Sequence, residues 1–209
     1  MIYSTSQDAE GIAASIAEEN KVKTKAYQAN VSDPAAIEAV LQQIAADFGK
    51  LDIVVANAGI ANHHAAEDYT QDQYSQVMKV NMDGAFYTAQ AAARIFKKQF
   101  QNDGSTGNLI FTASVSALLV NVPQKQAAYN ASKAGVVQLA KCLAVEWVDF
   151  CRVNCVSPGF IATDMLSVHP EEWRTKWFAM IPADRLCDPY ELKGVSYCCF
   201  MRPLSLLTR

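Results

Sequence analysis

The chain alternates short apolar segments with longer segments of helical periodicity, and this alternation constrains its fold more than any other feature. The apolar segments predict strands near residues 1–4, 23–30, 51–55, 108–113 and 152–156. Helices are predicted for residues 8–19, 71–98 and 128–147, and for a segment that follows Ser32-Asp33-Pro34 and ends at Gly49. Strands that alternate with helices form right-handed βαβ units. The sequence therefore predicts an α/β protein with a doubly wound parallel sheet.

Residues 51–55 give a finer expectation about that sheet. They read LDIVV, an apolar run apart from Asp52. Such a run is typical of a parallel strand that helices cover on both faces.

Composition and charge exclude several classes of function. The chain has 209 residues, a net charge of −3 and a pI of about 5.6, which predicts a single domain that binds neither nucleic acid nor an anionic membrane. No apolar run approaches the roughly 20 residues that span a bilayer. Residues 1–10 lack the pattern of a signal peptide, and the six cysteines form no CxxC pair. We therefore expect a cytoplasmic protein with reduced, mostly buried thiols and no bound metal.

Three predicted strands run into small or hydrogen-bonding residues. Residues 51–55 lead into Asn57 and Gly59, residues 108–113 into Ser114, and residues 152–156 into Pro158 and Gly159. In a parallel sheet the ligand lies at the carboxyl ends of the strands. Three such endings in one chain predict a ligand site at this edge.

The segment QAAYNASKAG places Tyr129 and Lys133 four residues apart, on one face of a predicted helix. A phenol with an ordinary pKa near 10 is a poor acid–base catalyst at neutral pH. A nearby ammonium group stabilises the phenolate, and the pair then becomes a usable proton donor or acceptor. The alternative interpretation is an ordinary aromatic–lysine pair on a helix, because this spacing occurs in many unrelated helices.

Taken together and in this order, these motifs resemble those of the short-chain dehydrogenase/reductases, which have a Rossmann-like fold. The resemblance covers about residues 1–194 and rests on Asn57-Ala58-Gly59, Asn81 in KVNMDG, Ser114 in TASVS, Tyr129 and Lys133 in YNASK, and Pro158-Gly159 with Thr163 in PGFIAT. The segments ANAGI, LAVEW and NCVSPGFIATDM are most similar to the branch of sorbose, xylulose and mannitol-type reductases.

The resemblance implies a hydride transfer between NADP(H) and a carbonyl or secondary alcohol, such as a ketose or polyol. Tyr129 would give a proton to the carbonyl oxygen, and Lys133 would lower the tyrosine pKa and hold the nicotinamide ribose. Ser114 would steady the developing oxyanion, and Asn81 would hold a water that links Lys133 to solvent. The remaining residues implied in cofactor binding are Asn30, Asn57, Gly59, Pro158, Gly159, Ile161 and Thr163.

The serine assignment leaves an alternative open. Ser114 and Ser116 lie 15 and 13 residues before Tyr129, and the family often uses the shorter spacing. We favour Ser114, because Ala117 then occupies the usual small position three residues later.

Other polar and aromatic residues have two interpretations each. Asn81 would tie its long helix to a neighbouring strand, with or without a water relay. His63 and His64 are expected to be solvated loop residues, although one of them could lie at the substrate mouth. The stretch with His169, Trp173, Trp177 and Phe178 could form an apolar lid or an ordinary helix contact.

The resemblance also guides the choice of cofactor. NAD specificity usually needs a carboxylate at the end of the second strand, to bind both ribose hydroxyls. Here the corresponding residues are Tyr3-Ser4-Thr5-Ser6, without an acid. Hydroxyl groups suit a 2′-phosphate, so we predict NADP(H).

Both ends of the chain depart from the family pattern. We expect that the first strand, glycine-rich turn and helix are missing, and that residues 195–209 form a divergent tail in place of a C-terminal strand. The full-length form is expected to be a homo-oligomer, a dimer or a tetramer. Two alternatives to an active enzyme follow: a catalytically inactive fragment, or a non-enzymatic dinucleotide-binding protein.

Overall fold

The computed structural model describes residues 1–163, 166 and 169–200. Five strands are present: β1 (Ile2–Tyr3), β2 (Tyr27–Gln28), β3 (Ile53–Ala56), β4 (Gly107–Thr112) and β5 (Cys151–Val156). The α-helices are α1 (Ala9–Asn20), α2 (Pro34–Phe48), α3 (Gln71–Met78), α4 (Gly84–Asp103), α5 (Ala127–Glu146), α7 (Glu171–Met180) and α8 (Leu192–Phe200). A π-helical turn, Lys79–Asp83, joins α3 to α4, so the long helix predicted for residues 71–98 is confirmed with an interruption.

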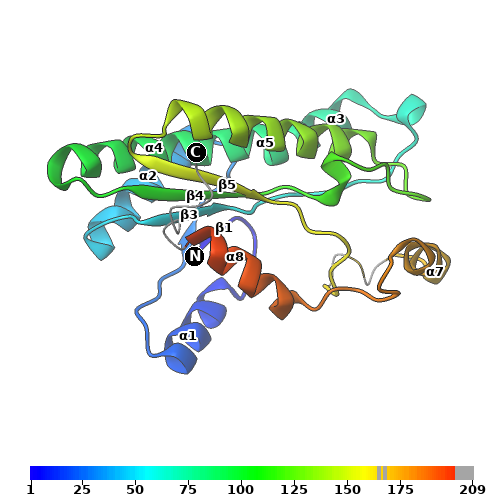
Figure 1. Cartoon of the computed structure of the whole chain (residues 1–209), viewed down its shortest axis with the longest axis horizontal. Coiled ribbons are helices and arrows are strands. Elements are labelled where there is room, and N and C mark those ends of the chain that lie inside the picture. Colours follow the sequence, from blue (N-terminus) through cyan, green and yellow to red (C-terminus); the bar gives the residue numbers. More distant parts are fainter. Residues whose placement is uncertain (164–165, 167–168, 201–209) are drawn as a thin grey trace.

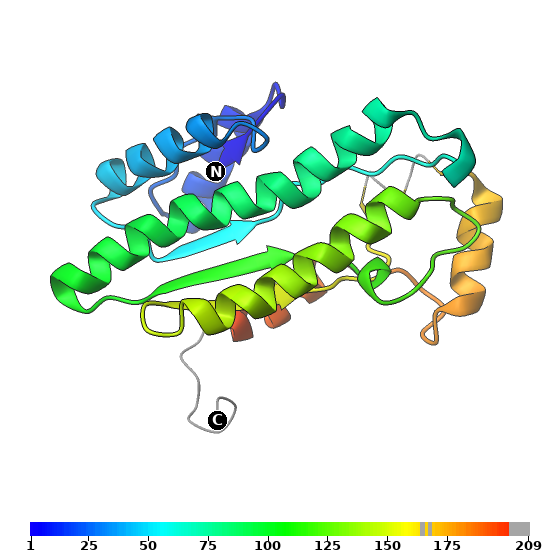
Figure 2. The same ribbon diagram turned by 90° about the horizontal axis from the view of Figure 1, so that it is seen from above.

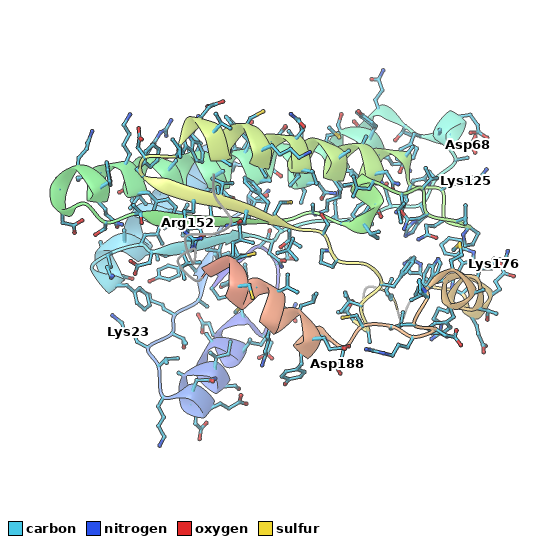
Figure 3. All side chains as sticks on the ribbon, in the orientation of Figure 1. Lys23, Asp68, Lys125, Arg152, Lys176 and Asp188 are labelled. Atoms are coloured by element: carbon cyan, nitrogen blue, oxygen red, sulfur yellow. The ribbon has the colours of Figure 1, made fainter. Side chains whose placement is uncertain are left out.

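The strands are parallel and are covered by helices on both sides. Figures 1 and 2 show α2, α4 and α5 packed over one face, while α1 and α8 lie over the other. On that second face, Arg152 of β5 donates to the carbonyl of Cys199 on α8, at 3.2 Å (Figure 3). The predicted α/β fold with a doubly wound parallel sheet is confirmed. No helix in the described part of the chain is both long and apolar enough to cross a membrane.

The strands form two separate sheets. β3, β4 and β5 form a three-stranded sheet in that order, and β1 pairs with β2 in a two-stranded sheet. Ile2 of β1 and Ile53 of β3 both line a cavity of about 1100 Å³. β1 and β3 therefore both border this cavity and are not hydrogen-bonded to each other.

One prediction about β3 is wrong. Residues 51–55 were expected to be covered on both faces, but burial alternates along β3. Val54 and Ala56 pack in the core beneath α4, whereas Ile53 and Val55, on the other face of the strand, are 44% and 47% exposed. The strand expected over residues 23–30 is also reduced to the two residues of β2.

The signals at the ends of α2 act as predicted. The Asp33 side chain accepts hydrogen bonds from the backbone N–H groups of Ala35 and Ala36 at 2.9 and 3.1 Å, which satisfies two otherwise unpaired donors. Gly49 ends the helix with a φ of +84°, a conformation that glycine adopts without strain. The helix buries Ile37 and Leu41, which packs it into the core beside α4.

The thiols are less buried than expected. All six cysteines are free, but only Cys151 is buried, and Cys142 and Cys198 are exposed. The prediction of mostly buried thiols is therefore wrong, because several of them lie on outer helix faces rather than in the sheet.

Candidate active site

The three loops that follow β3, β4 and β5 meet at one edge of the sheet. The register pairs Ala56 with Phe111 and Thr112 with Val156, so the strands end side by side. Beyond them, the backbone N–H of Val115 donates to the carbonyl of Pro158 at 2.8 Å. The prediction that these loops come together is confirmed, and α5 brings Tyr129 and Lys133 to the same edge.

Lys133 is buried at the centre of this edge. Only 4% of it is exposed, and its Nζ donates to the carbonyl of Thr112 at 2.7 Å. The Nζ also lies 5.7 Å from the centre of the Tyr129 ring. A methyl group at Gly59 would lie only 3.4 Å from this Nζ. The predicted Tyr–Lys pair and Gly59 are therefore neighbours in space.

Asn81 lies in the π-helical turn and is 1% exposed. Its Oδ1 accepts from the N–H of Ile60 at 2.8 Å, and its Nδ2 donates to the Ile60 carbonyl at 2.9 Å and to Ser132 Oγ at 3.0 Å. The side chain thus ties the long helix both to the loop after β3 and to α5. The anchoring role expected of Asn81 is present, and π-helical turns are often found at functional sites.

Ser114 and Ser116 are hydrogen-bonded to each other, so both candidate serines lie at the same place in the site. Ser114 Oγ accepts from the Ser116 N–H and donates to Ser116 Oγ, both at 3.1 Å. Both serines and Tyr129 line a cavity of about 120 Å³. The hydroxyl of Ser114 acts to lower the pKa of Tyr129, which favours Ser114 over Ser116 as its partner.

Burial dominates the ionisation of the Tyr–Lys pair. It raises the pKa of Tyr129, and the nearby Ser114 hydroxyl opposes that rise. Burial lowers the pKa of Lys133 from 10.5 to about 8, because the ammonium group loses its hydration. In this geometry the Nζ is directed to the Thr112 carbonyl, and the lowering of the Tyr129 pKa by Lys133 stays a prediction.

The residues predicted to bind a cofactor divide between two cavities. The large cavity is lined by Asn30, Asn57 and Gly59, together with Tyr3, Ser4 and Thr5. Asn30 also accepts from the N–H of Ser32 at 3.0 Å, which closes a turn. The smaller cavity is lined by Gly159, Ile161 and Thr163. Pro158 lines neither of these two cavities, and its backbone carbonyl accepts from the Val115 N–H.

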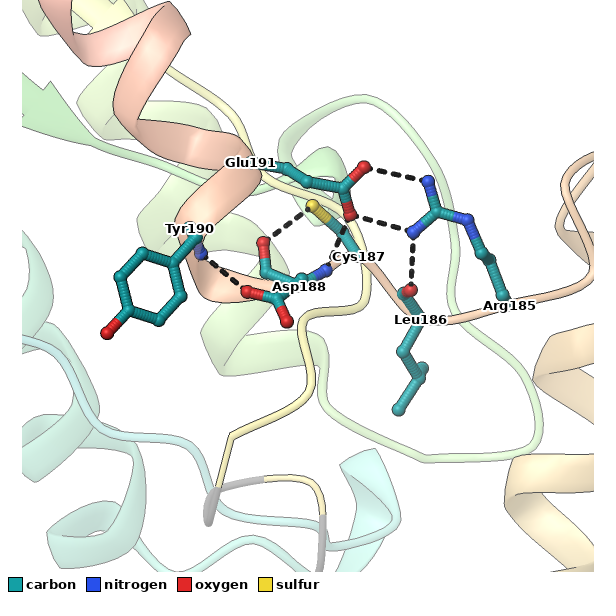
Figure 4. A network of polar contacts seen from close by, with 6 residues as sticks. All are labelled: Arg185, Leu186, Cys187, Asp188, Tyr190 and Glu191. Carbon is teal, nitrogen blue, oxygen red and sulfur yellow. Dashed lines mark hydrogen bonds and ion pairs between the residues drawn. The ribbon is translucent and has the colours of Figure 1, made fainter.

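The loop with Ile161 and Thr163 is fixed by the segment between α7 and α8. Ile161 pairs with Cys187 in a parallel bridge, and the Thr163 N–H donates to the Ile161 carbonyl at 2.8 Å. Beside Cys187, Arg185 forms a bidentate ion pair with Glu191, at 2.7 Å for both contacts (Figure 4). The Arg185 guanidinium holds the pKa of Glu191 at about 2. This network gives the loop a defined position over the small cavity.

Three amide side chains of the small cavity were not predicted from the sequence: Asn121, Gln124 and Gln126. Gln126 Nε2 donates to Asn121 Oδ1 at 3.0 Å, and Gln124 Oε1 accepts from the indole N–H of Trp177 at 2.8 Å. The signal was the amide-rich run QKQ, which lies directly before α5. Amides next to a helix with a reactive tyrosine are candidates for substrate contacts.

The histidines and aromatic residues separate into distinct roles. His63 lines the small cavity, as the minority interpretation proposed, whereas His64 contacts the ring of Tyr69 at 5.3 Å between centroids. Trp177 of α7 is completely buried and stacks on Phe160 at 4.7 Å. This part of the expected lid is a packed helix contact.

Comparisons with known proteins agree with this geometry. A family model described as enoyl-(acyl carrier protein) reductase matches residues 1–205. Sorbose reductase of Schizosaccharomyces pombe is 43% identical over 196 residues, which are 93% of this chain and 75% of that protein. NADP-dependent mannitol dehydrogenase of Alternaria alternata is 39% identical, over 91% of this chain and 70% of that enzyme.

A solved structure gives the same result for the fold. The NADPH-dependent 3-quinuclidinone reductase from Rhodotorula rubra superposes with a TM-score of 0.91 and 34% identity. The superposition covers 99% of this chain and 76% of that structure. With the family model, the relatives and the fold in agreement, the chain belongs to the short-chain dehydrogenase/reductase family.

Proposed function

We propose that the protein is an NADP(H)-dependent oxidoreductase that interconverts a ketose and a polyol, with Tyr129 as the acid or base. The observation that carries this proposal is the arrangement at α5. Ser114 and Tyr129 line a small polar cavity, while Lys133, one helical turn away, lies beside Gly59 of the large cavity. A site for a reacting oxygen is thus adjacent to a site of cofactor size.

The large cavity fits a phosphorylated dinucleotide. Tyr3, Ser4 and Thr5 contribute hydroxyl groups to its lining and no carboxylate, which at this position would repel a 2′-phosphate; the acidic residue of the lining is Asp72 of α3. Asn57 and Gly59 line the same cavity closer to Lys133. The relatives named NADP-dependent mannitol dehydrogenase support this choice of cofactor. When bound, NADPH would supply the hydride.

Four side chains at this edge of the sheet have a defined task in carbonyl reduction. Tyr129 would donate its phenolic proton to the carbonyl oxygen, and Ser114 would donate a second hydrogen bond to the same oxygen. Lys133, with a pKa of about 8, is mostly protonated at pH 7. Its ammonium would bind ribose hydroxyls and, once turned toward Tyr129, stabilise the phenolate. Asn81 would keep the loop after β3 in place through Ile60.

The ketose or polyol substrate is supported by the polar lining of the small cavity. Serine, asparagine, glutamine, tyrosine, threonine and histidine side chains all contribute to it. The relatives include sorbose reductase, mannitol dehydrogenase and L-xylulose reductase. We also propose that the protein is a homo-oligomer, a dimer or a tetramer, and sedimentation would establish its size.

The test is NADPH-dependent reduction of sorbose by the purified chain, with Tyr129→Phe as the variant. We expect Tyr129→Phe to bind NADPH normally and to lose at least about a hundredfold in kcat, because proton transfer contributes about that much. An equal turnover by both proteins would refute the role of Tyr129.

A second candidate is a chain that binds the dinucleotide without catalysis. The interruption between the two sheets favours a loss of catalysis, because β3, whose loop carries Asn57 and Gly59, is an edge strand that does not pair with β1. Saturable NADPH binding with no turnover of any ketose or ketone by the wild-type chain would select this candidate.

A further inference from the structure

The small cavity contains a histidine that the proposed reaction does not use. His63 lies in the loop after β3, and it lines the same cavity as Ser114 and Tyr129. Its Nδ1 is enclosed, and it has no hydrogen-bond partner among the described residues. Buried polar atoms are nearly always paired, so this ring has hydrogen-bonding capacity that no described protein group uses.

Aromatic neighbours hold the imidazole ring of His63 in one orientation. His169 meets it edge-on at 4.8 Å between ring centroids, and Trp173 does so at 5.7 Å. His169 in turn stacks on Trp173 at 5.5 Å. The ring is therefore fixed by packing from the segment around α7, rather than by hydrogen bonds.

The surroundings of His63 keep the ring neutral at pH 7. Burial lowers its pKa, and the positive charges that His169 and His64 can acquire lower it further. A neutral imidazole has one N–H donor and one acceptor nitrogen. An unpaired buried N–H is rarer than an unpaired buried acceptor. We therefore assign the proton to Nε2, since Nδ1 is the enclosed nitrogen.

The amides of the cavity are already engaged with protein groups. Gln126 donates to Asn121 and Asn130 at 3.0 Å each. Gln124 accepts from the indole of Trp177 at 2.8 Å, in a fully buried contact. Gln126 is thus committed to protein groups, whereas the His63 ring can donate without breaking any hydrogen bond among the described residues; the Nε2 group of Gln124 is a second such donor.

We propose that His63 is a specificity-determining residue, which donates from Nε2 to a hydroxyl group of a polyhydroxylated substrate whose carbonyl lies at Ser114 and Tyr129. This inference rests on the proposed function. It adds that the enzyme distinguishes a ketose from a simple ketone through this contact. A ketone without further hydroxyl groups has nothing to accept the hydrogen bond, whereas a ketose has several acceptors.

The test compares two substrates in three proteins: wild type, His63→Leu and the matched control His64→Leu. The substrates are sorbose and cyclohexanone, with NADPH. We expect His63→Leu to reduce kcat/KM for sorbose about tenfold, as loss of one hydrogen bond implies, and to leave cyclohexanone nearly unchanged. His64→Leu should change neither, because its ring contacts Tyr69 outside the cavity. His63→Gln, which restores a neutral donor, should recover part of the sorbose activity.

Equal losses for both substrates in His63→Leu would overturn the proposal, because they indicate a structural role. Unchanged kinetics with sorbose would overturn it as well. If the wild type reduces neither substrate, the proposed function fails, and ligand-detected NMR of sorbose binding decides about His63 separately. Binding that is severalfold weaker in His63→Leu than in the wild type would support the contact, and equal or absent binding would refute it.

Discussion

Replacing Lys133 by methionine should stabilise the unliganded protein at neutral pH, although it removes a group that the proposed reaction needs. Lys133 is 4% exposed, and its pKa falls from 10.5 to about 8. Because one pKa unit corresponds to about 1.4 kcal/mol, holding the ammonium in this site costs about 3 kcal/mol at pH 7. Methionine has a similar length without the charge, so it avoids that cost.

The substitution also removes a favourable contact. The bond from Lys133 Nζ to the Thr112 carbonyl, at 2.7 Å, contributes about 1 to 2 kcal/mol. The net expectation is a gain of about 1 to 2 kcal/mol in the free energy of unfolding at pH 7. For a chain of this size, that corresponds to a rise in Tm of roughly 2 to 8 °C.

The sign of the pH dependence gives a sharper test. Between pH 8 and 10.5 the unfolded chain keeps the proton on Lys133 and the folded chain loses it, so folding releases a proton. The wild type should therefore gain stability from this group as the pH rises through that range. Lys133→Met lacks this gain, so its advantage over the wild type should shrink from pH 8 upward, disappear at about pH 9 to 10 and then reverse, because the lost bond to the Thr112 carbonyl remains.

The assay is urea denaturation at pH 7, 8, 9 and 10, followed by circular dichroism. Lys141→Met is the control, because Lys141 is an exposed lysine on the same helix. A loss of stability in Lys133→Met at pH 7, or a pH-independent difference from the wild type, would refute the reasoning. Either result would mean that the buried ammonium is stabilised by more than the Thr112 carbonyl.

Two further predictions concern packing and anchoring. Gly107→Ala should destabilise the fold by about 1 to 3 kcal/mol in urea denaturation, because the added methyl would lie 2.1 Å from the ring of Phe96. The control is Gly194→Ala, which has open space around it and should not destabilise the fold. Equal effects of the two substitutions would contradict the packing argument. Asn81→Ala should lower the free energy of unfolding by about 2 to 4 kcal/mol, because the Ile60 N–H and carbonyl lose their partners. It should also weaken NADPH binding. Unchanged stability in calorimetry would show that this anchor is dispensable.

Much of the site could be predicted because local sequence determines it. The four-residue spacing of Tyr129 and Lys133 places both on one face of α5, whatever packs around it. The strand endings at Asn57, Ser114 and Pro158 meet because parallel strands end at one edge. Helix α2 begins and ends where Asp33 and Gly49 predict.

Other features depend on neighbours that are far apart in the sequence. The run of residues 51–55 predicts a strand, but its exposure depends on which of its faces packs in the core. The pKa of Tyr129 depends on burial, and the direction of the Lys133 ammonium depends on the Thr112 carbonyl of another element. Spacing along a helix contains no information about either.

The sequence by itself determined the order of strands and helices, the family, and the residue types that meet at the edge of the sheet. These follow from periodicity and local motifs, which act over a few residues. The tertiary structure alone decided that hydrogen bonding stops between β1 and β3, that Lys133 is held as a costly buried ammonium, and that His63 rather than His64 lines the small cavity. Those outcomes depend on desolvation and on contacts between distant segments, which only the folded chain brings together.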